Sequence, residues 1–515
     1  MTDPAQHNSI QGKPIMEPYD EHNQKLVGYV HPHDWTNPEP QDRYHMVVIG
    51  AGTAGLVTAI VAASLGAKVA LIERHFMGGD CLNIGCVPSK GVISAARAWS
   101  QRSRQPFGAP TAKDDGDFAK AMERMRRLRA DISHIDSAQR FSDEGVDVFL
   151  GSGEFTGPNT VQVTGPAGDA TLNFKKACIA TGARAAAPPI PGLSDVDFLT
   201  NETIFSLTER PESLTVIGAG PIGCEMAQSF AMFGTEVTVL DMAPQVLIRE
   251  DQDAAEIVQE SMVQDGVRLE LDAAIERIEQ DGDRKVVHFT RNGESHSVAS
   301  EHLLVAVGRK PNTDGLGLET VGVEYDKQGV ITDERLRTSN KNIFAAGDVT
   351  HELKFTHLAD AHAQTVIQNA FFFGRKKTSS LVVPWATYTS PEIAHVGLYE
   401  HDAKGQGKDI EVIKIGLDDV DRAILDGEDE GFVKVVLEKG SDKILGATVV
   451  AAHAGDLLTP LTFAITHGIG LGKFAGTIFP YPVQSDAIKK AAGAWRKQKL
   501  TPTAKKIFDL WFRVF

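Results

Sequence analysis

Two segments of the sequence repeat one pattern: a short apolar run, three glycines, a stretch rich in small residues, a second apolar run and an acid. The glycines and acids are Gly50, Gly52, Gly55 and Glu73 in the first copy, and Gly218, Gly220, Gly223 and Asp241 in the second. In both copies 23 positions separate the first glycine from the acid. The pattern predicts two strand–turn–helix–strand units.

The chemistry of such a unit follows from its three glycines. The first permits a tight turn, the second lets a pyrophosphate approach the backbone, and the third allows close packing of helix on strand. The phosphates then lie at a helix N-terminus, and the acid can accept from ribose hydroxyls. One copy would be weak evidence, but two at equal spacing are strong. The sequence predicts two dinucleotide sites; two ordinary glycine turns in an α/β sheet are the alternative.

A pair of cysteines lies between the two copies. Cys81 and Cys86 form a Cys-x4-Cys motif and are two of only four cysteines in 515 residues. This number is too small for a disulfide scaffold, and the start of the chain does not resemble a secretory signal. In a reducing compartment a close pair indicates redox or metal chemistry. Zinc would need a second pair, so we predict redox chemistry and no metal site. The single thiols Cys178 and Cys224 are expected to be packing residues.

The cysteine pair also assigns the two cofactors. A disulfide takes electrons from a reduced flavin only if it lies against the flavin ring, and the cysteine segment begins five residues after Glu73. The first unit should therefore bind FAD and the second a nicotinamide nucleotide. Asp241 favours NADH, because a carboxylate there would repel the 2′-phosphate of NADPH. Arg249 could reach such a phosphate, so NADPH stays an alternative.

Composition narrows the function classes. The net charge of −16 argues against nucleic acid as a partner, and no apolar run is long enough for a membrane span. We expect a cytoplasmic protein of about three domains. Residues 1–43 contain six prolines and lack a sustained period, which predicts an extended or disordered arm.

The other end of the chain has the opposite charge. Residues 489–515 contain eight Lys or Arg and a single acid. Pro502 is placed to start a helix, whose apolar residues then share one face: Ile507, Leu510, Trp511, Val514 and Phe515. A basic amphipathic helix of this kind docks on the protein's own dimer or on an anionic membrane surface.

These motifs together resemble the class I flavoprotein disulfide oxidoreductases, the family of dihydrolipoamide dehydrogenase, glutathione reductase and mercuric reductase. The resemblance covers residues 44–498. Thr181 and Gly182 resemble the turn at which the chain leaves the FAD domain, and Gly308 lies in a segment similar to the end of the NAD domain. Asp348 resembles the aspartate that bonds the flavin ribityl chain.

The resemblance implies an α/β fold with two Rossmann-like dinucleotide-binding domains, for FAD and NAD, and a C-terminal α+β dimerisation domain. The predicted organisation is an N-terminal arm (1–43), an FAD domain in two parts (44–190 and 319–378), an inserted NAD(P) domain (191–318), a dimerisation domain (379–498) and a basic amphipathic helix (499–515).

The resemblance also implies an electron relay from NADH through FAD to the Cys81–Cys86 disulfide. Cys86 would face the flavin as the charge-transfer thiolate, and Cys81 would exchange with the acceptor. A helix over 89–99, opened by Cys86, would stabilise that thiolate through its N-terminus. Gly79 lies in the flavin-binding segment. Lys90 and Glu225 match positions that pair beside the flavin.

The chain departs from the family near its C-terminus. Tyr481 and Asp486 occupy the places of a histidine and glutamate that serve as acid and base for the exchange thiol. A tyrosine is a poor base at neutral pH, which weakens the case for lipoamide or glutathione. His453 and His467 lie away from that position. Mercuric reductases carry the same Phe-Pro-Tyr, but they also carry a C-terminal cysteine pair that is missing from this sequence.

Three hypotheses follow from these residues. The first is a homodimeric, mercuric reductase-like oxidoreductase that reduces a metal ion or small molecule. The second is a dihydrolipoamide dehydrogenase with an altered acid–base dyad. The third, from another class, is a membrane-peripheral redox sensor or electron-donor module.

Overall fold

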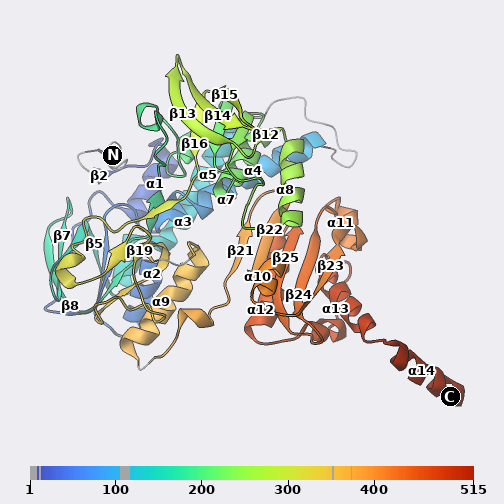
Figure 1. Ribbon diagram of the computed structural model, residues 1–515. Helices are drawn as coiled ribbons and strands as arrows, with labels where there is room; N and C mark the ends of the chain where they lie inside the picture. The colour runs from blue at the N-terminus through green and yellow to red at the C-terminus, as the bar shows by residue number, and fades with distance from the viewer. Residues whose placement is uncertain (1–8, 11–12, 105–115, 351–352, 373) are drawn as a thin grey trace. The chain divides into compact units, whose positions relative to one another are not determined.

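The computed structural model describes residues 9–10, 13–104, 116–350, 353–372 and 374–515. The chain forms two compact units, which are coloured by residue number in Figure 1. Unit 1 comprises residues 1–218, 232–236 and 275–381, and unit 2 comprises residues 219–231, 237–274 and 382–515. The domain boundaries given above stay a prediction.

A seven-stranded sheet forms the centre of unit 1. Its order is β5-β4-β3-β8-β7-β6, and β20 also pairs with β8. Strands β5, β4, β3, β8 and β20 are parallel, whereas β8, β7 and β6 form an antiparallel meander. The strands are β3 (Tyr44–Ile49), β4 (Val69–Glu73), β5 (Val146–Leu150), β6 (Ser152–Gly157), β7 (Thr160–Thr164), β8 (Ala170–Ile179) and β20 (Ile343–Ala345).

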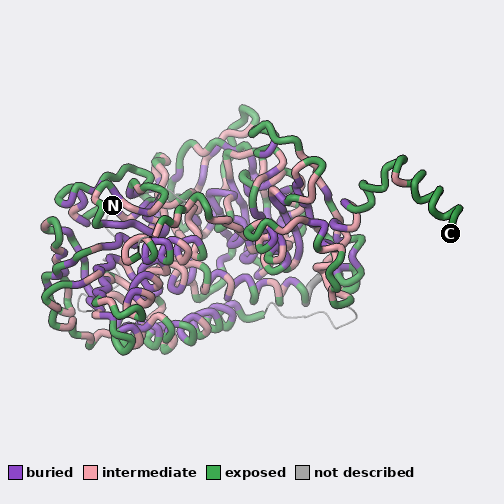
Figure 2. Tube along the Cα trace, turned by 90° about the horizontal axis from the view of Figure 1, so that it is seen from below, coloured by how far each residue is buried: buried purple, intermediate pink, exposed green. Residues whose placement is uncertain are grey.

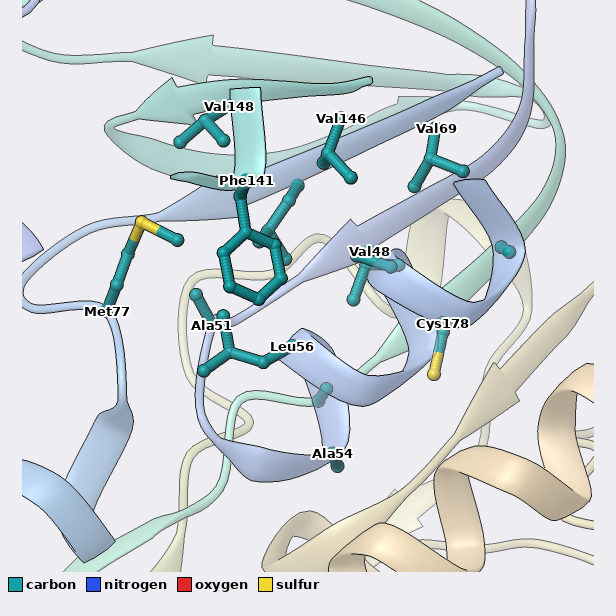
Figure 3. Close-up of a cluster of buried hydrophobic side chains, with 14 of the residues drawn as sticks. Val48, Ala51, Ala54, Leu56, Val69, Met77, Phe141, Val146, Val148 and Cys178 are labelled. Carbon is teal, nitrogen blue, oxygen red and sulfur yellow. The ribbon is translucent and has the colours of Figure 1, made fainter. Parts of the chain in front are cut away.

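Helices of unit 1 pack on this sheet or on one another. They are α2 (Thr53–Ser64), α3 (Gly79–Asn83), α4 (Cys86–Arg104), α5 (Phe118–Ile132), α6 (Ala138–Asp143) and α9 (Thr356–Phe371). Figure 3 shows Val48, Leu56 and Cys178 in the resulting core. Burial raises the pKa of the Cys178 thiol to about 12. Cys178 is therefore a neutral packing residue, as expected, and Cys224 is equally buried.

The expectation of an extended or disordered arm is wrong for residues 21–30. This segment forms helix α1 (Glu21–Val30), with Leu26 and Val30 fully buried. Asp20 caps the helix by accepting from the Asn23 N–H at 2.9 Å. The Asn23 side chain in turn accepts from Arg129 of α5 at 2.7 Å. Residues 1–8 and 11–12 lie outside the described residues.

The second glycine segment follows the same local order as the first. Strand β10 (Ser213–Ile217) leads into the glycines, helix α7 (Pro221–Met232) and strand β11 (Glu236–Leu240). In unit 1, β10 pairs in parallel with β16 (His302–Val305). In unit 2, β11 pairs in parallel with β12 (Val267–Glu270), and α8 (Gln252–Gln264) connects these two strands. Three further strands form a separate sheet: β13 (Ala274–Asp281), β14 (Arg284–Arg291) and β15 (Glu294–Ser300).

The C-terminal part of unit 2 is an antiparallel sheet of order β21-β22-β25-β24-β23. The strands are β21 (Pro384–Thr387), β22 (Glu392–Gly397), β23 (Ile410–Gly416), β24 (Phe432–Glu438) and β25 (Ile444–Ala451). Helices α12 (Ala454–Thr466) and α13 (Asp486–Gln498) contribute Leu458, Leu461 and Ile488 to its core. This sheet-and-helix module agrees with the predicted α+β part of the fold.

Helix α14 (Pro502–Val514) follows α13 after a short connection. It begins where the sequence predicted, because Thr501 accepts from the Ala504 N–H at 3.2 Å and Pro502 occupies the first turn. Figure 2 shows α14 as exposed along almost its whole length. No helix in the described part of the chain is both long and apolar enough to cross a bilayer.

Candidate active site

The carboxyl ends of four parallel strands meet at one edge of the unit 1 sheet. Ile49 at the end of β3 is paired with Ile72 of β4 and Ile179 of β8, and Ile179 is paired with Ala345 of β20. The segments that follow these strands therefore lie at the same edge. They contain the predicted cofactor residues Gly50, Glu73, Thr181, Gly182 and Asp348. In open α/β sheets, ligands bind beyond this edge.

The first glycine turn is tightly built. Gly50 has a φ of 102°, and a Cβ there would lie 2.4 Å from the Ala180 carbonyl oxygen. A Cβ on Gly55 would lie 1.8 Å from the Gly50 oxygen, so helix and strand touch backbone to backbone. Helix α2 begins at Thr53, and its N-cap Gly52 offers no side-chain acceptor. The N–H groups at this helix end are available to an anion.

Glu73 holds this turn in place. One carboxylate oxygen accepts from the Ala51 N–H at 2.7 Å, and the other accepts from the His75 N–H at 2.8 Å. A carboxylate has about four acceptor positions, so Glu73 can still accept from a ribose hydroxyl. Glu73, which is expected to bind the ribose, therefore also fixes the backbone of the turn that is predicted to hold the phosphates.

The second glycine turn repeats this arrangement. Gly218 has a φ of 107°. In unit 2, the Asp241 carboxylate accepts from the Ala219 N–H at 2.6 Å and from the Ala243 N–H at 2.8 Å. A Cβ on Gly220 would meet no atom within 4 Å. The position predicted to face a pyrophosphate is therefore open.

The two predicted redox cysteines lie on consecutive helices of unit 1. Cys81 is in α3, and Cys86 is the first residue of α4. Both are thiols here, with Cys86 exposed and Cys81 half-buried. Hydrogen bonding to Cys86 and burial raise the pKa of Cys81. The Cys86 sulfur lies 3.4 Å from the Thr356 hydroxyl at the start of α9, a neighbour that the sequence analysis did not identify.

Helix α3 lies directly on the first glycine turn. Gly79, its first residue, has a φ of 57°, and a Cβ there would lie 2.6 Å from the Gly52 Cα. Only glycine allows this approach. Helix α3, which carries Cys81, therefore packs against the first glycine turn. The sequence alone only suggested that the cysteines lie near this turn.

An ion-pair cluster beside Cys81 was also missed by the sequence analysis. Arg309 donates to the carboxylate of Asp80, the residue before Cys81, and its Nε lies 3.6 Å from Asp348. Arg309 also donates to the Ala183 carbonyl. Burial raises the pKa of Asp348, and Arg309 partly offsets this effect. The sequence signal for this cluster was Asp80, an acidic residue immediately before Cys81.

Thr181 and Gly182 connect the sheet edge to the segment that contains Gly308. The Thr181 hydroxyl donates to the Asn312 carbonyl at 2.6 Å, and the Asn312 N–H donates to the Gly182 carbonyl at 3.0 Å. Gly182 and Gly308 have φ values of 69° and 94°. These bonds fix the turn after β8, where the chain leaves the first nucleotide fold.

The predicted partners Lys90 and Glu225 belong to different units. Lys90 follows Cys86 by one helical turn on α4 and donates to the Ser89 hydroxyl at 3.3 Å. Glu225 is buried on α7, where it accepts from the Tyr388 N–H at 3.0 Å. Their pairing stays a prediction, as does the position of Gly223 beside the nicotinamide nucleotide.

Tyr481 and Asp486 lie in unit 2. Tyr481 is 76 % exposed, and its hydroxyl donates to Asp421 at 2.7 Å. This hydrogen bond raises the pKa of Tyr481, so the phenol stays protonated at neutral pH. Asp486 is the first residue of α13. The structure therefore gives Tyr481 a carboxylate partner, Asp421, that the sequence did not indicate.

Comparison with known proteins identifies the class of this fold. Residues 44–364 match the pyridine nucleotide-disulphide oxidoreductase family, and residues 383–492 match the dimerisation domain of that family. The chain belongs to the pyridine nucleotide-disulphide oxidoreductases.

The relatives include more than one enzyme. A mercuric reductase of Bacillus cereus is 37% identical over 88% of this chain and 72% of its own length. A dihydrolipoyl dehydrogenase of Geobacillus stearothermophilus is 33% identical over 87% of this chain and 95% of its own. A Cu(II) complex of the HOCl-induced flavoprotein disulfide reductase RclA from Escherichia coli is 29% identical, with a TM-score of 0.80 over 88% of this chain and 100% of that structure.

The family is FAD-dependent and takes electrons from NAD(P)H. The first glycine turn fits FAD: its uncapped helix end can receive the pyrophosphate, and the close contact of Gly79 with Gly52 leaves no room for a side chain over the cradle. Gly50, Gly52, Glu73 and Asp348 would hold the cofactor. When bound there, FAD would supply the chemistry that accepts electrons from the nicotinamide nucleotide and passes them on to the predicted cysteine pair.

Proposed function

We propose that this protein transfers two electrons from NADH to the Cys81–Cys86 pair through FAD, and from there to a metal ion or small electrophile. The observation that carries the proposal is the contact of α3 with the first glycine turn. That contact supports the proposal, because Cys81 and the turn proposed to hold the FAD phosphates then belong to one piece of structure. By family resemblance the protein acts as a homodimer, which the match of residues 383–492 to a dimerisation domain supports.

The two thiols have unequal environments. Cys86 starts a helix, where the backbone N–H groups favour a thiolate, and its sulfur lies beside the Thr356 hydroxyl. The raised pKa of Cys81 keeps that thiol protonated while Cys86 is charged. When the pair closes to a disulfide from this state, it releases two electrons and the one proton held by Cys81. These electrons suffice for one Hg²⁺ reduced to the metal or for two Cu²⁺ reduced to Cu⁺.

The acceptor class is inferred from Tyr481. Release of a thiol product requires a proton donor and acceptor that cycles near neutral pH, and a phenol whose pKa is raised by Asp421 does not cycle there. A thiophilic metal ion needs no such proton. Relatives named for mercury and a structural neighbour in complex with Cu(II) point to the same class of acceptor.

NADH is the proposed donor. Both oxygens of Asp241 are fixed by backbone N–H groups, so the carboxylate cannot turn away from a 2′-phosphate. Repulsion between these two anions should raise the KM for NADPH above that for NADH by roughly tenfold. Steady-state kinetics with both nucleotides measures this ratio.

Anaerobic titration with NADH tests the relay. The wild-type holoenzyme should develop a long-wavelength thiolate-to-flavin absorption band, and Cys86→Ser should abolish it. Cys178→Ala is the matched control, because it removes a buried packing thiol and should keep the band. Absence of the band from the wild type would overturn the relay.

An acceptor screen with Hg²⁺, Cu²⁺ and lipoamide separates the remaining candidates. We expect turnover with a metal ion, little with lipoamide, and a small effect of Tyr481→Phe on metal reduction. The 33% identity to a dihydrolipoyl dehydrogenase supports a second candidate function. In that case the protein would be a lipoamide enzyme in which Tyr481 and Asp486 replace the usual histidine and glutamate. Rapid lipoamide turnover that Tyr481→Phe abolishes would establish that candidate instead.

A further inference from the structure

Helix α14 presents a broad apolar surface. Ile507, Leu510, Trp511 and Val514 are each more than half exposed, and they lie on one side of the helix because of their spacing. Phe508 and Phe512 widen this surface. The apolar sector thus contains three exposed aromatic residues within two helical turns: Phe508, Trp511 and Phe512.

The opposite side of α14 is basic. Lys505, Lys506 and Arg513 lie off the apolar sector, and Asp509 is the only acid of the helix. The preceding helix α13 ends in Arg496 and Lys497, and Lys499 follows it. This concentration of positive charge stands in a chain whose net charge is −16. The segment is therefore complementary to an anionic surface, unlike the chain as a whole.

The helix is separate from the part of the chain that relatives use to dimerise. The match to the family dimerisation domain ends at residue 492, whereas α14 starts at Pro502. Because that domain provides a dimer interface without α14, a second copy of the chain is a weaker candidate to cover the apolar face. An anionic lipid surface can interact with both sides of the helix. The aromatic side chains would be buried among the acyl chains, and the headgroup phosphates would bind the lysines and the arginine.

We propose that α14 is an interfacial anchor that binds this oxidoreductase to an anionic lipid bilayer, lying in the headgroup plane without crossing it. At about 1.5 Å per residue its 13 residues extend for about 20 Å, which is enough for two or three turns of contact. One such helix gives reversible binding. Two copies in a homodimer would strengthen binding through avidity.

Vesicle co-sedimentation of the full-length holoenzyme tests the anchor. The protein should sediment with vesicles of phosphatidylglycerol and phosphatidylcholine, and much less with phosphatidylcholine alone or at high salt. Lys505→Glu with Lys506→Glu should weaken binding by about tenfold or more. Lys408→Glu is the charge control, because it changes an exposed lysine elsewhere in unit 2. Trp511→Ser with Phe512→Ser should weaken binding at unchanged charge.

A truncated chain distinguishes a lipid surface from a second copy of the chain as the partner of α14. A chain ending at Leu500 should lose vesicle binding and keep its flavin, its NADH-dependent activity in solution and its oligomeric state. If that truncation instead dissociates a dimer, α14 covers a second copy and the anchor is overturned. If the full-length protein ignores anionic vesicles, the anchor is likewise overturned, whether or not α14 binds another protein. Neither result affects the relay, which is measured without membranes.

Discussion

The two glycine turns share one design and differ in what covers them. In each, an acid 23 residues after the first glycine accepts from two backbone N–H groups, Glu73 in one turn and Asp241 in the other. The first turn is covered by α3, since Gly79 meets Gly52. The second is open, since a Cβ on Gly220 would meet no atom within 4 Å.

In the proposed relay this difference would separate a resident cofactor from an exchanging one. The backbone of α3, the helix that carries Cys81, lies against the first turn, so we expect a dinucleotide bound there to be released slowly. A dinucleotide in the second turn can leave without moving a helix at that glycine. The proposed relay needs both behaviours, because its FAD would remain bound while each nicotinamide nucleotide is replaced after it has reacted.

The largest expected effect comes from Gly55→Ala. A methyl group there would lie 1.8 Å from the Gly50 oxygen, so β3 and α2 must separate. We expect the free energy of unfolding to fall by about 3 kcal/mol or more and the purified protein to lose flavin. Thermal unfolding and flavin absorbance per protein measure both effects.

Gly220→Ala changes the second glycine of the other turn, where a methyl would meet no atom within 4 Å. It should leave stability and flavin content unaltered and raise the KM for NADH by about tenfold, because the methyl occupies the space of the pyrophosphate. A loss of stability in Gly220→Ala as large as that in Gly55→Ala would contradict the open space at Gly220.

The next largest effect is expected from changes to Glu73 and Asp241, the acids that accept from the backbone N–H groups of the two turns. Glu73→Gln and Asp241→Asn each leave one backbone N–H facing an amide NH2, at a cost of about 2 kcal/mol. In the first turn this cost should appear as loss of flavin during purification. In the second it should appear as weaker NADH binding in an enzyme with full flavin content. Equal flavin loss in both variants would show that the turns are not specialised.

The effect that is smallest at neutral pH is a pH dependence in the first unit. His362 on α9 is fully buried, its Nδ1 accepts from the Gly347 N–H at 3.3 Å, and burial lowers its pKa to about 4. The unfolded chain takes up a proton near pH 6.5. The free energy of unfolding should therefore fall as pH falls from 6.5 towards 4, by about 1.4 kcal/mol per unit. His362→Gln should remove that part of the slope in urea unfolding.

His395 provides the control for this experiment. It is buried in unit 2, and burial also lowers its pKa to about 4. His395→Gln should flatten the pH dependence of unfolding but leave acid release of flavin unchanged, whereas His362→Gln should reduce both. Gly347 precedes Asp348 and lies against Ala54 of α2, so protonation of His362 disturbs the first turn specifically.

Local patterns were the most predictable part of the molecule. The glycine turns, the helix that starts at Cys86 and the helix that starts after Thr501 depend on contacts within a few residues, and sequence spacing records such contacts. Helix α1 was missed because its buried face is short and its stability depends on Arg129, which lies 106 positions away from Asn23.

The sequence by itself determined the family, the fold class and the two nucleotide segments, because each depends on residue types at fixed spacing. Only the tertiary structure brought Arg309 to Asp80, 229 positions apart, gave Tyr481 its partner Asp421, and covered one glycine turn with α3 while leaving the other open. These features arise from backbone packing between distant segments, and no local pattern of residues encodes which side chains such packing will bring together.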